Sequence, residues 1–152
     1  MNKNINPEII IILLPLILGF TIGFLFKPDK WYLNLKKPSL IPPPILFSIV
    51  WFILYIMIGV SYYIALKNKQ FIYWIFPIIH LLLNLLYTPL LFGAHNLILS
   101  SIVLLLTLIT AIIVLILFYI YDKTGKAYKL LIPYILWLLV ANYLGWSVYF
   151  LN

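Results

Sequence analysis

The chain alternates five long apolar stretches with short polar segments. Each stretch holds 18 residues or more, and together they cover residues 9–26, 45–66, 71–92, 97–121 and 128–151. At about 1.5 Å per residue the shortest is about 27 Å long, close to the thickness of a bilayer's hydrocarbon core. Apolar residues fall on odd and even positions alike, whereas barrel strands alternate. The pattern predicts an all-α membrane protein, a five-helix transmembrane bundle forming one domain over residues 1–152.

The polar breaks between the stretches differ in length. Residues 27–44 form the longest, and Pro42, Pro43 and Pro44 at its end cannot continue a helix but suit the first turn of the next one.

The first apolar stretch, residues 9–26, is either a retained helix or a cleaved signal peptide. We expect a retained helix, because the stretch is long for a signal sequence and no small-residue cleavage motif precedes Lys27.

Composition supports a membrane location. Hydrophobic residues make up 66% of the chain and charged residues 9%, against about 25% charged in average soluble domains. The ten cations are lysines spread between the apolar stretches, which is typical of loop anchors beside anionic headgroups and not of a nucleic-acid-binding face. With five spans, the N-terminus lies on the same side of the membrane as the second and fourth connections. This side carries six of the lysines: Lys3, Lys67, Lys69, Lys123, Lys126 and Lys129. Their number favours a cytoplasmic N-terminus.

Aromatic and polar side chains inside the apolar stretches are candidates for a binding site. An unpaired amide such as Asn84 costs on the order of a few kcal/mol in hydrocarbon, so we expect it to face the bundle interior. Trp51 and Tyr55 are four residues apart and share a helix face. Together with Tyr87 and Trp137 they are expected to line one mostly aromatic pocket, suited to a flat hydrophobic ligand. Tryptophan and tyrosine are also common at the membrane–water interface. This explains the aromatic residues near the ends of the apolar stretches: Trp31, Tyr73, Trp74 and Trp146.

Other candidate chemistry is sparse. His80 is interpreted either as a hydrogen-bonded packing residue or as a haem ligand. The three carboxylates, Glu8, Asp29 and Asp122, are far apart in the sequence, which argues against two-carboxylate hydrolysis and carboxylate proton relays. The chain has no cysteine, so disulfides and thiolate metal sites are excluded, and no metal site is predicted.

Small residues recur at four-residue spacing on two stretches. Gly19 and Gly23 form one such pair, and Ala141 and Gly145 form the other. This spacing allows two helices to approach closely. Either pair could serve packing within one bundle or a seam between two copies of the chain.

The long first connection carries a recognisable motif. Residues 31–43 read W-Y-x-x-L-x-K-P-x-x-x-P-P, and Trp51, Tyr55, Asn84 and Trp137 follow in order. This pattern closely resembles the TspO/MBR family of tryptophan-rich sensory proteins and translocator proteins (peripheral benzodiazepine receptors). The resemblance covers nearly the whole chain.

The resemblance implies a multi-pass protein of a cell membrane, expected to be bacterial and homodimeric. Its first connection would cover a pocket for porphyrins such as protoporphyrin IX or haem, bound as ligands and not as required cofactors, or for sterols. Matched position by position, Trp31 and Tyr32 belong to the cover. The pocket wall would comprise Trp51, Tyr55, Asn84, Trp137 and Ala141, with Tyr87 beside them.

Two kinds of function follow from the resemblance. In bacterial relatives the tryptophans that match Trp51 and Trp137 are implicated in light-dependent breakdown of protoporphyrin, which makes these two residues candidate catalytic residues. The alternative is a transporter, uptake factor or sensor for tetrapyrroles or sterol-like lipids, without chemistry. Two departures bear on the choice: Tyr87 stands where the family often has tryptophan, and no basic residue follows Lys129 to complete the sterol motif of animal members.

Overall fold

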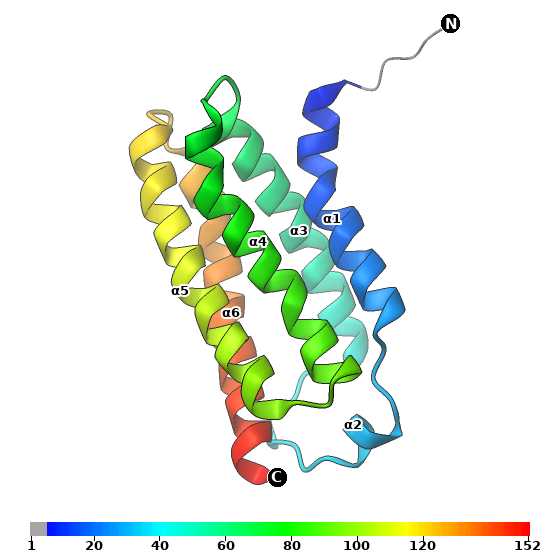
Figure 1. The fold of residues 1–152 in the computed structure, drawn as a ribbon. Helices are drawn as coiled ribbons and strands as arrows, with labels where there is room; N and C mark the ends of the chain where they lie inside the picture. Colours follow the sequence, from blue (N-terminus) through cyan, green and yellow to red (C-terminus); the bar gives the residue numbers. More distant parts are fainter. Residues whose placement is uncertain (1–5) are drawn as a thin grey trace, which may run out of the picture.

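The computed structural model describes residues 6–152, so Lys3 of the orientation argument lies outside the described residues. Five helical segments are long and apolar enough to cross a membrane, as predicted, and they form one bundle (Figure 1). The elements in chain order are α1 (Pro7–Leu25), α2 (Lys30–Asn34), α3 (Pro44–Leu66), η1 (Phe71–Trp74), α4 (Ile75–Thr88), η2 (Pro89–Gly93), α5 (Leu97–Tyr121) and α6 (Lys126–Leu151).

Two predicted segments differ in detail from the structure. The connection over residues 27–44 is not all loop, because it holds the short helix α2, which Asp29 caps by accepting a hydrogen bond from the Tyr32 amide at 3.1 Å. The third span is not one regular helix. It ends in a π-helical turn at Pro89, where the Ala94 amide donates to the Pro89 carbonyl at 2.9 Å. Proline lacks an amide hydrogen, so the regular pattern changes there.

The helices pack in a fixed order around the bundle. α5 lies between α4 and α6, α6 also packs on α3, and α1 packs mainly on α3. α1 is the most peripheral, and large apolar side chains such as Phe24 and Ile17 are exposed along it. Such exposure is expected where lipid, and not water, surrounds the protein.

The two ends of the bundle are filled differently. At one end, α1 and α3 approach so closely that the backbone of Ile12 lies against Gly59, with 2.7 Å between the Ile12 carbonyl carbon and the Cβ that any larger residue would add. Tyr62 follows Gly59 by three residues on α3, and it belongs to one core cluster with Phe118 and Tyr134, all almost completely buried. We call this region the packed end. The opposite end, which α2 covers, contains a cavity.

A cavity capped by the first connection

The cavity lies among α1, α3, α4, α5 and α6, and the first connection covers it. Its volume is about 780 Å³, within the range of about 300–1,000 Å³ typical of small-molecule sites. Most of its surface is apolar, and α5 and α6 contribute aliphatic residues, Gly145 and two serines to its wall. Nine aromatic residues also line it: Phe20, Phe24, Phe26, Tyr32, Phe47, Trp51, Tyr55, Tyr87 and Phe92.

A chain of hydrogen bonds connects the cavity wall to the packed end. The Tyr55 hydroxyl donates to Asn84 Oδ1 at 2.8 Å, and Asn84 Nδ2 donates to the Tyr134 oxygen at 2.9 Å. Tyr134 also contacts His80 Nε2 at 2.8 Å, and His80 Nδ1 contacts Tyr62 at 2.7 Å. These side chains come from α3, α4 and α6, so the network ties three helices together.

Counting donors fixes the protonation of this network. The Tyr62 hydroxyl lies 3.0 Å from the Pro77 carbonyl, which can only accept, so its proton goes there. His80 Nδ1 must then donate to the Tyr62 oxygen, which leaves Nε2 to accept the proton of Tyr134. With His80 neutral and protonated on Nδ1, every contact pairs one donor with one acceptor. His80 is therefore a hydrogen-bonded packing residue, and both ring nitrogens are occupied within the protein.

Among residues 6–152, two lysines and no carboxylate line the cavity. Lys37 is bound to the connection, because its Nζ donates to the carbonyls of Tyr32, Leu33 and Leu35 at 2.9, 3.0 and 3.3 Å. Lys27 Nζ lies 4.3 Å from the centroid of the Phe24 ring and has no hydrogen-bond partner within residues 6–152. The part of the cavity next to the first connection, which we call its mouth, is therefore positively charged. The ammonium group of Lys27 is available there to a ligand.

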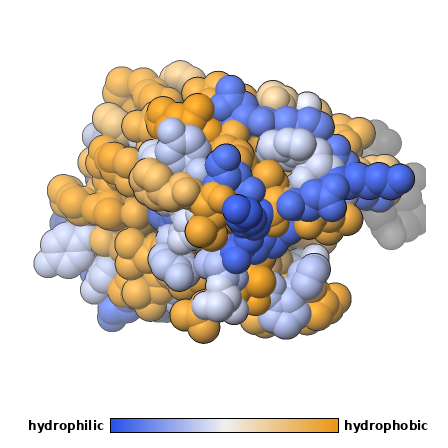
Figure 2. Space-filling view, turned by 90° about the horizontal axis from the view of Figure 1, so that it is seen from below, coloured by the Kyte–Doolittle hydropathy of each residue, from blue (hydrophilic) through white to orange (hydrophobic). Residues whose placement is uncertain are grey.

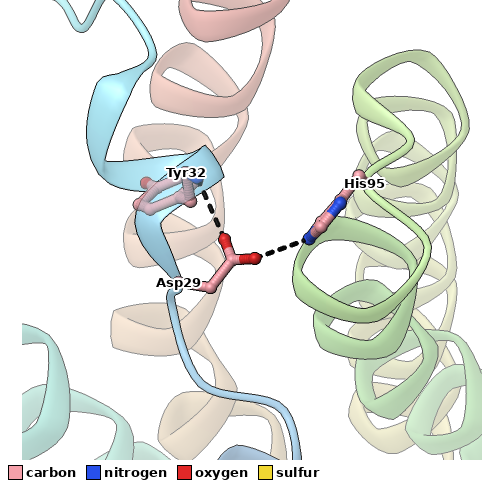
Figure 3. A network of polar contacts seen from close by, with 3 residues as sticks. All are labelled: Asp29, Tyr32 and His95. Atoms are coloured by element: carbon pink, nitrogen blue, oxygen red, sulfur yellow. Dashed lines mark hydrogen bonds and ion pairs between the residues drawn. The ribbon is translucent and has the colours of Figure 1, made fainter.

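Asp29 joins the first connection to the turn between η2 and α5 (Figure 3). One carboxylate oxygen caps α2, and the other lies 3.0 Å from His95 Nε2. The Trp31 ring stacks on His95 with 4.3 Å between ring centroids. Tyr32 packs edge-on against Phe92 at 4.9 Å, and both rings line the cavity. We call the contact of Asp29 and Trp31 with His95 the latch.

A second attachment holds the middle of the same connection. The Lys36 amide donates to Asn152 Oδ1 at 2.9 Å, and Asn152 Nδ2 donates to the Lys36 carbonyl at 3.0 Å. Seen from this end, hydrophilic side chains cross the face of the bundle with hydrophobic ones around them (Figure 2). The cover is thus polar outside, attached at two points, and places the Tyr32 ring in the cavity.

Polar surroundings shift the pKa values of groups outside the spans. The hydrogen bond from the Tyr32 amide, helped by His95, holds the pKa of Asp29 below its usual value. Burial raises the pKa of the Tyr32 hydroxyl, which keeps it protonated at neutral pH. At the other end of the bundle, burial opposes ionisation of Asp122, but hydrogen bonds from Ala127, Thr124 and Lys126 outweigh it and lower the pKa. Asp29 and Asp122 are therefore ionised at neutral pH.

Most of the predicted site residues meet at the cavity. Its lining includes Tyr32, Trp51, Tyr55, Asn84, Tyr87 and Ala141, but not Trp31 or Trp137. Trp31 lies on the outer side of the cover against His95. Trp137 packs edge-on against Phe47 at 5.4 Å, one layer behind the wall, and its buried Nε1 has no hydrogen-bond partner within the described residues. The ligand and catalytic roles of these residues remain predictions.

Sequence reasoning missed several cavity residues. Lys27 was expected to anchor a loop, yet it also lines the cavity. Ser100 and Ser101 also line the cavity, and the latch partner His95 looked like an ordinary turn residue. The available signal for the serines was that they are polar residues inside an apolar stretch. No local pattern pairs Asp29 with His95, because they are far apart along the chain.

Comparison with known proteins identifies the family of the chain. The TspO/MBR family matches residues 11–151. A tryptophan-rich protein TspO of Archaeoglobus fulgidus is 36% identical over 98% of this chain and 99% of its own length. Protein CrtK of Rhodobacter capsulatus is 34% identical over 86% of this chain and 83% of its own, and a translocator protein homolog of Schizosaccharomyces pombe is 30% identical over 92% and 88%. The chain is an integral, multi-pass membrane protein that belongs to the TspO/MBR family.

Proposed function

We propose that the cavity binds a flat, mostly apolar molecule that carries an anionic group, and that porphyrins such as protoporphyrin IX are its ligand class. The observation that carries the proposal is a cavity of about 780 Å³ with nine aromatic residues in its lining. In the part of the chain that the structure describes, lysine is the sole kind of charged residue in that lining. Aromatic walls favour stacking with a planar ring system. Lys27 at the mouth would attract a carboxylate, and the ring would extend inward beside Trp51.

Polar groups in the wall would orient the ligand. Asn84 uses one amide hydrogen on Tyr134, and its second has no acceptor within residues 6–152. Asn84 lines the cavity, so this N–H is available to an acceptor on the ligand. The hydrogen bond from Tyr55 fixes which way the amide points. A ligand with an acceptor on its apolar body would therefore bind better than a pure hydrocarbon.

A titration of the purified protein in detergent tests the proposal. Protoporphyrin IX added in the dark should quench tryptophan fluorescence with a saturating curve, and Trp51→Ala should weaken binding by about 10-fold through the lost stacking surface. Trp146→Phe is the matched control, since Trp146 does not line the cavity. Equal affinity of the wild type and Trp51→Ala would contradict the proposed site.

Two further arms separate binding from the activities that the family resemblance suggests. Illumination of the complex tests for porphyrin breakdown, and Trp51→Phe should remove any light-dependent product if the indole takes part. Trp137→Phe should have the smaller effect, because Trp137 lies behind Phe47. Flux of labelled porphyrin into proteoliposomes tests transport. A protein that binds porphyrin without transporting it would show no flux.

A further inference from the structure

We infer that Gly23 is a specificity-determining residue of the cavity: its missing side chain leaves the space in which the edge of a large planar ligand lies. The inference rests on the proposed function and adds to it the residue that sets the size of the ligand. It also divides the glycine pair of α1 into one residue that serves packing and one that serves binding.

The two glycines of the pair have different surroundings. A Cβ added at Gly19 would lie against the ring of Tyr55, with 2.9 Å to Cδ2 and still closer contacts to Cε2 and Cζ. That ring is buried and held by its hydrogen bond to Asn84, so it cannot move without loss. A Cβ added at Gly23 would meet no atom within 4 Å outside its own stretch of helix. Gly19 is required by packing, whereas Gly23 is not.

The open space at Gly23 belongs to the cavity. Gly19 and Gly23 are four residues apart on α1, so they share a helix face. That face points at Tyr55, and both glycines line the cavity together with Tyr55. A side chain at Gly23 would therefore project toward the ligand space, one turn closer than Gly19 to Lys27 at the mouth.

Other glycines in the bundle fit packing roles. Gly59 lies against the backbone of Ile12, and Gly93 lies against the Phe26 ring, with 2.8 Å from its added Cβ to two ring carbons. A Cβ at Gly145 would lie 3.1 Å from Leu104. Gly23 lies in the last turn of α1, and no close neighbour requires a glycine there. It differs in this from Gly59, Gly93 and Gly145, and it faces the cavity.

The test compares ligands of two sizes on variants of one helix face. Gly23→Leu and Gly23→Ala are purified in detergent beside Gly19→Ala and the wild type. Dissociation constants are measured for protoporphyrin IX and for the smaller planar anion 2-naphthoate, and thermal unfolding is recorded for each protein. Ile17→Phe enlarges an exposed residue of α1 that does not line the cavity, and it serves as the matched control.

We expect Gly23→Leu to weaken protoporphyrin binding by about 10-fold or more, and 2-naphthoate binding by less than about twofold, with unfolding unchanged. Gly23→Ala should fall between it and the wild type, and Gly19→Ala should unfold more easily. Unchanged protoporphyrin binding by Gly23→Leu would overturn the inference, and so would a loss of folded Gly23→Ala. A wild type that binds neither ligand would overturn the proposed function itself.

Discussion

The packed end and the cavity end of this bundle are built from the same kinds of residue but use them differently. At the packed end, Tyr62 and Tyr134 donate their hydroxyl protons to partners within the protein and pack around His80. At the cavity end, Trp51 and Tyr87 line open space, and one amide hydrogen of Asn84 has no acceptor within residues 6–152. The proposed ligand site is thus the end of the bundle where an amide hydrogen is unpaired and Gly23 has no close neighbour.

The largest effect is expected from filling the packed end at Gly59. Gly59→Leu would place its side chain against the Ile12 backbone, which cannot move aside without separating α1 from α3. Overpacking of this kind costs about 3 kcal/mol, and more where backbone is in the way. Unfolding in detergent, followed by circular dichroism, measures the loss. Gly23→Leu is the control. Equal destabilisation of the two variants would contradict the claim that the packed end, unlike the cavity end, has no room for a larger side chain.

Removal of the histidine from the packed network is expected to be the next largest change. His80→Leu keeps the bulk of the side chain but leaves the hydroxyls of Tyr62 and Tyr134 short of a partner, at a cost of about 2–3 kcal/mol. The same unfolding assay checks it. His80→Gln, which retains a donor and an acceptor, should recover part of the stability. Protoporphyrin affinity should change less than stability, because His80 does not line the cavity.

Asn84 lies where the two ends meet, so its removal should affect both. Asn84→Ala breaks the bond from Tyr55 and the bond to Tyr134, and we expect a loss of about 1–2 kcal/mol in stability. The freed Tyr55 ring and the lost amide should also weaken protoporphyrin binding by about 10-fold. Stability and affinity are measured on the same preparation. A change in stability alone would place Asn84 in the packed network and outside the ligand site.

The smallest effect is expected at the latch. Asp29→Ala removes the cap of α2 and the contact with His95, so the Tyr32 amide should exchange its hydrogen about threefold faster. The pKa of Asp29 is lowered in the folded protein, so its contribution is complete above the ordinary value of 3.8 and is lost as pH falls below it. Hydrogen exchange of residues 30–35 measures both effects. Exchange that is insensitive to the substitution would show that the Lys36–Asn152 contact alone holds the cover.

The sequence predicts the spans well because hydropathy depends on length and composition alone. The predicted boundaries of the fourth span coincide with those of α5, and the others differ by a few residues at most. The short helix α2 was missed because five residues between lysines and prolines give no helical periodicity. The π-turn at Pro89 was also missed, because it depends on which carbonyl groups the neighbouring turn leaves available.

The cavity was predicted less completely than the spans. Asn84 was placed correctly, because an amide in hydrocarbon must face the interior. Trp137 looked equally suitable from its depth in the helix, but it packs against Phe47 of another helix and does not line the cavity. Gly23 was grouped with Gly19 by spacing, and only the position of Tyr55 separates them. Such distinctions depend on contacts between helices that one helix's sequence does not encode.

The space beside Trp51, Asn84 and Ala141 is the proposed ligand site. A crystal structure of the protein with protoporphyrin IX would locate the ligand. We expect a planar ring inside the cavity, stacked near Trp51, with a carboxylate near Lys27 and its edge in the space at Gly23. Protoporphyrin bound only on the lipid-facing surface of the helices, with the cavity unoccupied, would contradict it.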